Sequence, residues 1–243
     1  MKSPPKPKRA LKRTTVYIKI DAQYYRNKCI ILIKANGKLI FWNFAKRETL
    51  KSYVKSFKEL KNLNYKVIGV TSDWHGSIIS AVKQSFKGIP HQRCLVHTQR
   101  RCQSLITRKP KTKQGKQLLE IVRLLNKVTN HYEKNIWIKW LNRWEERNID
   151  FIKQKTHGFK EDGSKTWWYT HKNLRGAFRT LKSSQNNLFL YLEYEDMDKD
   201  TNGIESEFSH LKQKVNMHRG LRIKQKLAVI AWYISLVNFR RKK

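Results

Sequence analysis

Residues 65–97, YKVIGVTSDWHGSIISAVKQSFKGIPHQRCLVH, decide the fold that this sequence predicts. The apolar, β-branched run at 67–70 predicts a strand, and residues 78–86 carry apolar side chains at helical spacing. Asp73 follows the strand directly. Because side chains at the carboxyl ends of buried strands line the ligand crevice of open α/β sheets, Asp73 is a candidate catalytic acid. An Asp in this position can instead cap the following helix.

Three more strands are expected before this stretch. Alternating Val16, Ile18 and Ile20 predict a strand that runs into Asp21. The apolar runs 29–34 and 39–44 are separated by Asn-Gly, the strongest short signal for a hairpin. With a helix at 48–61 and a short strand at 94–97, the order is β-β-β-α-β-α-β. This order predicts a mixed α/β sheet with helices on its faces.

The second half of the sequence favours helices. Residues 98–200 lack strand-like alternation and are interpreted as a helical insertion, with Trp137, Trp140 and Trp144 in its core. Trp167 or Trp168, outside a clear helix, could stack on an unpaired base. The expected organisation is a basic flexible arm at 1–13, the first part of the catalytic domain at 14–97, the insertion at 98–200, and C-terminal helices completing the domain at 201–243.

Charge is the extreme feature of the composition. The 243 residues include 53 Lys and Arg against 18 Asp and Glu, a formal net charge of +35, which favours nucleic acid as partner. A basic solvated surface is the alternative. Three irregularly spaced cysteines argue against a disulfide scaffold and for a reducing compartment. Without a secretory signal or a long apolar run, a cytoplasmic protein is expected, associated with the nucleoid if bacterial.

Three carboxylates can form a metal site. Asp21 and Asp73 each end a predicted strand, and these two strands could be neighbours in the sheet. The third candidate is Glu205, because Glu207, two residues further along a helix, would face elsewhere. Carboxylate oxygens suit Mg²⁺ or Mn²⁺, and three acids could hold two ions for an in-line phosphoryl transfer.

Four segments in order resemble a known family: the strand ending at Asp21, SDWHGSI with Asp73, HQRCLVH, and TNGIESEF before a Lys-rich helix and HRGL. They resemble the DDE transposases of bacterial insertion sequences, in the Mutator-like superfamily. The matching secondary motif consists of Cys94, His97 and Asn202. The acids are 52 and 132 residues apart. The resemblance implies a ribonuclease-H-like fold in which an all-helical insertion fills the longer gap.

The resemblance also implies an enzyme that cleaves DNA and transfers strands at transposon ends. Asp21, Asp73 and Glu205 would be the catalytic and metal-binding residues, with two Mg²⁺ or Mn²⁺ ions. The expected partners are double-stranded transposon ends and target DNA, with no membrane, and the active form is expected to be a homo-oligomer. The residues expected to contact DNA are His97, Lys212, Lys214 and Arg219.

Two alternative functions remain open at this stage. Relatives usually carry an N-terminal DNA-binding region of zinc-ribbon or helix-turn-helix type, and residues 1–13 do not supply one. A degenerate remnant that binds DNA without catalysis is therefore one alternative, and a structure-specific nuclease that never joins strands is the other. A zinc site made by His91, Cys94, His97 and Cys102 is a further possibility. The acidic stretch 193–200 is interpreted as a solvated turn.

Overall fold

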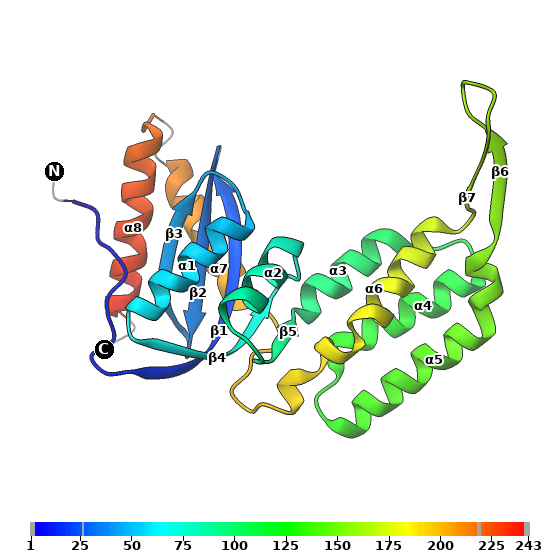
Figure 1. Cartoon of the computed structure of the whole chain (residues 1–243), viewed down its shortest axis with the longest axis horizontal. Coiled ribbons are helices and arrows are strands. Elements are labelled where there is room, and N and C mark those ends of the chain that lie inside the picture. Colours follow the sequence, from blue (N-terminus) through cyan, green and yellow to red (C-terminus); the bar gives the residue numbers. More distant parts are fainter. Residues whose placement is uncertain (1–2, 26, 218–219, 241–243) are drawn as a thin grey trace. The chain divides into compact units, whose positions relative to one another are not determined.

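A five-stranded mixed sheet is the centre of the first structural unit. Its strands are β1 (Thr14–Tyr25), β2 (Lys28–Ala35), β3 (Lys38–Ala45), β4 (Tyr65–Ser72) and β5 (His91–Arg93). They lie in the order β3-β2-β1-β4-β5 (Figure 1). The β1–β2 and β2–β3 pairs are antiparallel, and the β1–β4 and β4–β5 pairs are parallel. The sheet confirms the predicted mixed α/β class and the adjacency of the first and fourth strands, and it is consistent with a ribonuclease-H-like arrangement.

The chain is described by a computed structural model for residues 3–25, 27–217 and 220–240. It divides into two compact units. The first consists of Met1–Cys94 and Tyr194–Lys243, and the second is Leu95–Glu193. The second unit is therefore inserted between two sequence segments of the first. No helix in the described part of the chain is long and apolar enough to cross a membrane.

The hairpin between β2 and β3 has the geometry that its sequence predicts. Asn36 and Gly37 both have positive φ angles, 48° and 72°. Two-residue hairpin turns of type I′ require such angles at both central positions, and Asn and Gly tolerate them best. The turn sets β2 antiparallel to β3, so that Ala35 pairs with Lys38.

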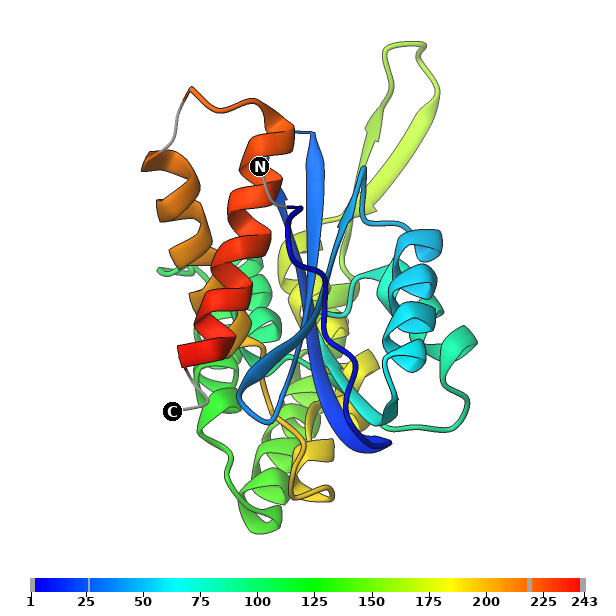
Figure 2. The same ribbon diagram turned by 90° about the vertical axis from the view of Figure 1, so that its left-hand side faces the viewer.

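Helices cover both faces of this sheet (Figure 2). One face packs against α1 (Leu50–Asn62) and α2 (Gly76–Ser85), where Phe57 and Ile78 share a buried cluster with the apolar side chains of β1. The other face packs against α7 (Asn202–Met217) and α8 (Ile223–Arg240). There Ile204 shares a buried cluster with the β2 side chains that point to this face. Burial on both faces explains why β2 is apolar throughout its central part.

The second unit is built mainly from helices. They are α3 (Leu95–Ile106), α4 (Lys113–Leu124), α5 (His131–Lys153) and α6 (Lys172–Leu188), with the short 3₁₀ turns η1 (Leu125–Lys127) and η2 (Leu190–Leu192). Trp137 and Trp144 are buried in its core, as predicted. The prediction for Trp140 is wrong: this side chain keeps 43% of its surface exposed on α5.

Three local predictions differ from the structure. Asp21 does not end its strand, because β1 continues to Tyr25. Residues 94–97 are not a strand: β5 ends at Arg93 and α3 begins at Leu95. The segment predicted as wholly helical also contains an antiparallel pair, β6 (Lys155–Phe159) and β7 (Lys165–Tyr169).

Candidate active site at one edge of the sheet

The register of β1 and β4 brings two of the predicted acids to the same level. Lys19 pairs with Thr71 across the parallel strands, an offset of 52 residues. Asp21 and Asp73 are separated by the same offset, two residues beyond that pair. Neighbouring strands lie about 4.8 Å apart. If this register continues, Asp21 on β1 and Asp73, the first residue after β4, lie at the same height, where the chain turns out of β4.

Both aspartates are only partly buried, and each is oriented by a backbone N–H. Asp21 Oδ1 accepts a hydrogen bond of 2.8 Å from Ala22 N, and Asp73 Oδ1 accepts one of 3.1 Å from His75 N. His75 is the N-cap residue of α2 and makes no side-chain capping bond. Asp73 thus closes the turn before the helix and does not occupy the N-cap position itself.

Glu205 and Glu207 point to different sides of α7, as predicted. Glu207 is 1% exposed, and its Oε1 lies 3.1 Å from the ammonium of Lys34. Glu205 is partly exposed. An advance of two residues rotates the side-chain direction by about 200° around a helix. Only Glu205 of the two is therefore directed away from the buried ion pair.

Two contacts set the position of α7 along β1. At its start, Gly203 lies over the sheet, because a Cβ there would be 3.5 Å from the ammonium groups of both Lys19 and Lys34. Further along, the Tyr25 hydroxyl donates a 3.2 Å hydrogen bond to the carbonyl of Phe208. Glu205 lies between these helix contacts, and Asp21 lies between the corresponding strand contacts. Asp21 and Glu205 are therefore on facing parts of β1 and α7.

Cys94 links the end of β5 to the start of α7. Its Sγ accepts 3.4 Å hydrogen bonds from both the backbone N–H and the hydroxyl of Thr201. Cys94 and Thr201 are buried, whereas Asn202 is exposed and its N–H donates to Asp200 Oδ1 at 3.0 Å. In this structure, Cys94 of the secondary motif helps to fix the helix that carries Glu205.

The acidic stretch before α7 is more ordered than a solvated turn. Asp198 Oδ1 lies 2.8 Å from the ammonium of Lys19, and the Asp198 carbonyl accepts a 2.6 Å hydrogen bond from the Thr71 hydroxyl. One residue of this stretch therefore contacts both β1 and β4. The β1 and β4 residues in these contacts, Lys19 and Thr71, lie two residues before Asp21 and Asp73.

Glu48 is a carboxylate near this edge that the sequence interpretation missed. Its Oε2 accepts a 3.2 Å hydrogen bond from the Tyr53 hydroxyl, and its N–H donates to the Tyr24 hydroxyl at 3.0 Å. Burial raises the pKa of Glu48; the Tyr53 bond opposes this, and the negative charge of Asp73 adds to it. Burial also raises the pKa of Cys29 to about 12, with smaller contributions from Glu48 and Asp21. Glu48 is therefore an electrostatic neighbour of Asp73, and Cys29 is a neighbour of both Glu48 and Asp21.

The predicted DNA-contacting residues are distributed over several elements. Lys212 and Lys214 are exposed on α7, which also carries Glu205. His97 lies in the first turn of α3 and belongs to the second unit. Arg219 lies outside the described residues. Two of the four predicted contacts are thus on the same helix as a candidate catalytic acid.

Side chains of the types that bind metals lie at this edge of the sheet, but the described residues do not form a preformed metal-binding cluster. Among the described residues, no group of three or more His, Cys, Asp or Glu side chains is close enough to hold a metal ion. This applies to Asp21, Asp73 and Glu205, and to the residues considered for zinc. His91, one of the latter, is buried with its Nε2 2.8 Å from the Ser72 hydroxyl. Oxygen donors such as these carboxylates suit Mg²⁺ better than zinc.

A comparison with models of known protein families identifies similarity to a transposase family. The family model described as "Transposase IS66 family" matches residues 70–216, which are 147 of the 243 residues. The match includes Asp73, Glu205 and the whole second unit, and Asp21 lies outside it. None of the curated proteins gives a significant match to this chain. The expected Mutator-like superfamily is not supported, because IS66 is a different family. Since the match covers more than half of the sequence, the chain belongs to the IS66 family of transposases.

Proposed function

We propose that this chain catalyses metal-dependent cleavage of DNA and strand transfer at transposon ends. Asp21, Asp73 and Glu205 are the proposed catalytic acids. The observation that supports the proposal is the offset of 52 residues between β1 and β4, which Asp21 and Asp73 share, together with the contacts of α7 to β1 on either side of Glu205. Membership of a transposase family implies DNA as the partner.

The proposed cofactor is Mg²⁺ or Mn²⁺, as two ions held by these three carboxylates. Two or three like charges at one edge repel each other, and a divalent cation removes this repulsion. Cation binding is therefore proposed to draw the side chains closer than in the structure. When bound, the ions would activate a water or 3′-hydroxyl and stabilise the leaving oxygen.

Two further groups of residues have roles in the proposed reaction. The exposed lysines of α7, Lys212 and Lys214, would bind phosphates on either side of the reacting one, which positions the strand without reading its sequence. The Lys34–Glu207 pair would hold α7 against the sheet so that Glu205 keeps its direction. Because two ends have to be joined to one target, the active form is proposed to be a homo-oligomer.

The test is an assay on duplex DNA that carries the ends of the element encoding this chain, with Mn²⁺ as the ion. The purified chain is compared with Asp21→Asn, Asp73→Asn and Glu205→Gln, and with Asp196→Asn as a matched control at an exposed acid of the same unit. Each site variant is expected to lose cleavage and joining by at least about 10³-fold and to keep its DNA affinity. Asp196→Asn is expected to behave as the unmodified chain.

The outcomes separate this proposal from its alternatives. Cleavage without joined product would favour a nuclease over a strand transferase. Binding without cleavage by the unmodified chain would favour a DNA-binding remnant. Cleavage that survives in any one of the three site variants would remove that residue from the catalytic set.

A further inference from the structure

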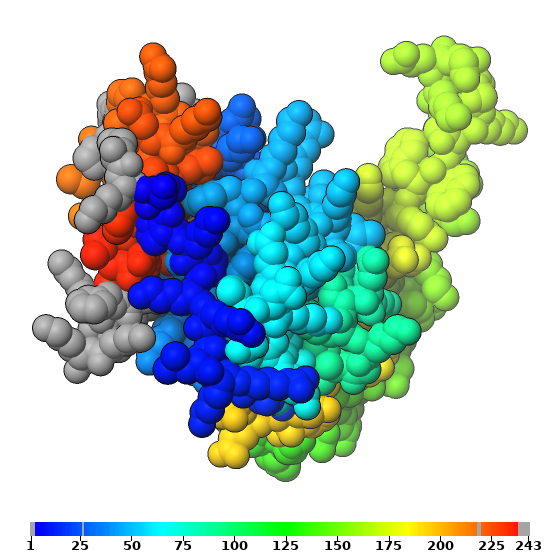
Figure 3. All heavy atoms as spheres, turned by 60° about the vertical axis from the view of Figure 1, so that its left-hand side comes forward, coloured from blue at the N-terminus to red at the C-terminus, as the bar shows by residue number. Residues whose placement is uncertain are grey.

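The β6–β7 hairpin carries a face rich in aromatic and basic side chains. It extends away from the helices of the second unit (Figure 1), and Figure 3 shows it standing clear of the surface. The strands pair with Lys155 opposite Tyr169, His157 opposite Trp167, and Phe159 opposite Lys165. Since side chains alternate between the two faces of a strand, these six residues share one face. We infer that this face binds single-stranded DNA, with bases stacked on its rings. Below, the face is called the 155–169 face.

The rings of the 155–169 face are more exposed than packing requires. Phe159 exposes 73% of its surface and Trp167 exposes 47%. A two-stranded hairpin needs buried apolar contacts for stability, and rings that remain in water contribute little to it. Exposed rings on a protruding element are therefore better explained by a partner that covers them.

Cations lie directly against these rings. The ammonium of Lys155 is 3.9 Å from the centre of the Trp167 ring, and the guanidinium of Arg175 is 3.9 Å from the centre of the Tyr169 ring. Trp167 and Tyr169 meet edge to face with their centres 5.4 Å apart. Rings with adjacent positive charges match a polymer that offers planar bases and phosphates together.

The opposite face of the hairpin has a different role. Trp168 lies across Gly158, because a Cβ at residue 158 would be only 3.0 Å from the Trp168 ring. Next to it, the hydroxyls of Thr156 and Thr170 are 2.8 Å apart and hydrogen-bonded. These contacts hold the two strands together. Trp168 thus contacts Gly158 on the opposite face and still exposes 48% of its surface, while its sequence neighbour Trp167 belongs to the 155–169 face.

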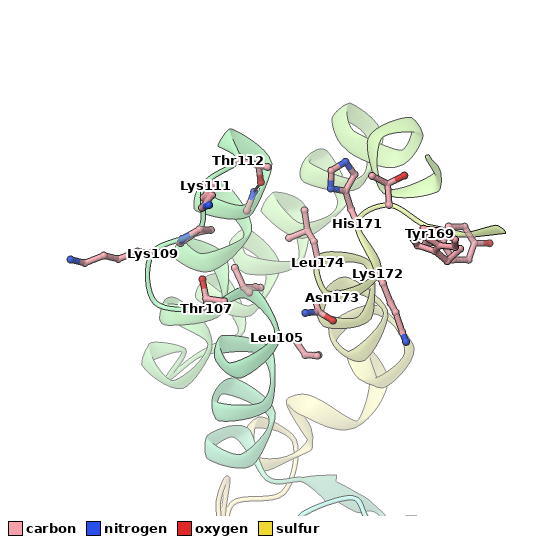
Figure 4. Close-up of a pocket in the computed structure, with 15 residues that line it drawn as sticks. Leu105, Thr107, Lys109, Lys111, Thr112, Tyr169, His171, Lys172, Asn173 and Leu174 are labelled. Carbon is pink, nitrogen blue, oxygen red and sulfur yellow. Dashed lines mark hydrogen bonds between the residues drawn. The ribbon is translucent and has the colours of Figure 1, made fainter. Parts of the chain in front are cut away.

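A basic cavity lies at the base of the same hairpin (Figure 4). It has a volume of about 490 Å³ and lies between the segment after α3 and the β7–α6 connection. Lys109, Lys111 and Lys172 line it together with Trp168 and Tyr169, and its lining includes no Asp or Glu. The positive charge beside the hairpin favours a polyanion and disfavours a basic or purely apolar partner.

The exposed ring faces favour single strands over duplexes. In a duplex the bases are stacked on one another, so their faces are not available to side chains, and only phosphates and groove edges can be contacted. A single strand presents both base faces and phosphates. An acidic peptide would satisfy the lysines but would leave Phe159 and Trp167 without planar partners. This inference concerns binding in the second unit and does not depend on the proposed catalysis.

The test measures the affinity of the full chain for a fluorescein-labelled 20-nucleotide oligo-dT and for a duplex of the same length, by anisotropy at one fixed salt concentration. Trp167→Ala is expected to weaken binding of the single strand about tenfold and to leave duplex binding within about twofold. Trp140→Ala is the matched control, with the same residue type at a similarly exposed position on α5, outside the hairpin and the cavity. Trp167→Phe retains a ring and should recover most of the affinity.

Several results would overturn the inference. One is an unchanged single-strand affinity in Trp167→Ala, and another is an equal loss for single strand and duplex. A third is an equal loss in Trp140→Ala, and a fourth is a larger loss in Trp168→Ala than in Trp167→Ala, which would move the main contact to the cavity or to the other face. Far-UV circular dichroism of each variant, with recovery by Trp167→Phe, separates a lost contact from a lost fold.

Discussion

The ammonium of Lys34 lies 3.1 Å from Glu207 Oε1, with both side chains buried between β2 and α7. Lys34 also donates a 3.0 Å hydrogen bond to the Gly203 carbonyl in the first turn of α7. One lysine of the sheet therefore holds the helix at two points on either side of Glu205. The direction of Glu205 therefore depends on a lysine outside the proposed catalytic set.

Glu207→Gln is expected to lower the free energy of unfolding by about 3–5 kcal/mol, because it leaves a buried ammonium without its counter-charge. Urea denaturation at pH 7 measures the change. Glu205→Gln is the matched control and should lose much less, because Glu205 is partly exposed. A larger loss of stability in Glu205→Gln than in Glu207→Gln would mean that Glu205, and not Glu207, balances the charge of Lys34.

Because the His91 side chain is buried, we expect the folded chain to lose stability in mild acid. Its ring is buried, with Nε2 2.8 Å from the Ser72 hydroxyl, and burial, with a smaller effect of Lys83, lowers its pKa to about 4. Between pH 6.5 and pH 4 the unfolded chain binds a proton at His91 and the folded chain does not, so stability falls as the pH falls. The full decrease in the free energy of unfolding is about 3 kcal/mol.

His91→Gln should flatten this part of the stability curve. The measurement is urea denaturation of both proteins at several pH values from 4 to 7, compared by slope and not by absolute stability. The other ionisable groups are common to both proteins and cancel in the comparison. Equal slopes would show that His91 binds its proton as readily in the folded chain as in the unfolded chain, contrary to its burial.

Gly69 is required by close packing between β4 and β1. A Cβ at this position would lie 2.5 Å from Tyr17 Cδ1 and 2.5 Å from Met197 Cε. Gly69→Ala is therefore expected to destabilise the fold by about 1–3 kcal/mol, because Tyr17 pairs with Gly69 and has little room to move. Gly76→Ala is the control, since a Cβ there meets nothing within 4 Å. Thermal melting of both variants checks the difference, and equal melting temperatures would contradict it.

Local sequence patterns were sufficient for most of the sheet. The Asn36-Gly37 turn and the alternation around Ile18 are contained in short segments, and the structure confirms the strands that they predict. The prediction of a strand at 94–97 was wrong for a physical reason. Cys94, Leu95 and Val96 form a short apolar run that suits a strand or a helix, and only the longer pattern ending at Ile106 distinguishes the two.

Other features depend on contacts that no local pattern contains. The β6 strand, KTHGF, is mostly polar, and its pairing with β7 is stabilised by Trp168 lying over Gly158. Glu48 looked like an ordinary residue at the start of a helix, and its proximity to Asp73 arises only when β4 and the β3–α1 connection meet in space. The three acids were predicted from the sequence because two of them follow the apolar runs of adjacent strands, and their catalytic role stays a prediction.

Glu48 offers a test of how far the acidic site extends. Its carboxylate is half-buried; burial raises its pKa, and the charge of Asp73 makes a smaller contribution in the same direction. If Asp73 holds a cation as proposed, the nearby negative charge of Glu48 should increase cation affinity. Glu48→Gln keeps the shape and an oxygen that can accept from the Tyr53 hydroxyl, but it removes the charge. We expect Mn²⁺ binding to weaken about three- to tenfold, equivalent to about 0.7–1.4 kcal/mol.

Isothermal titration of the full chain with Mn²⁺ measures this change. Glu59→Gln is the matched control, because Glu59 is a partly exposed acid of α1 whose Oε1 lies 3.9 Å from the ammonium of Lys55. Both variants lose one negative charge from the same helical region, so a general effect of net charge would lower Mn²⁺ affinity equally in the two. A loss confined to Glu48→Gln would make Glu48 an electrostatic part of the site. An unchanged affinity would restrict its role to the hydrogen bonds with Tyr24 and Tyr53, which fix the start of α1.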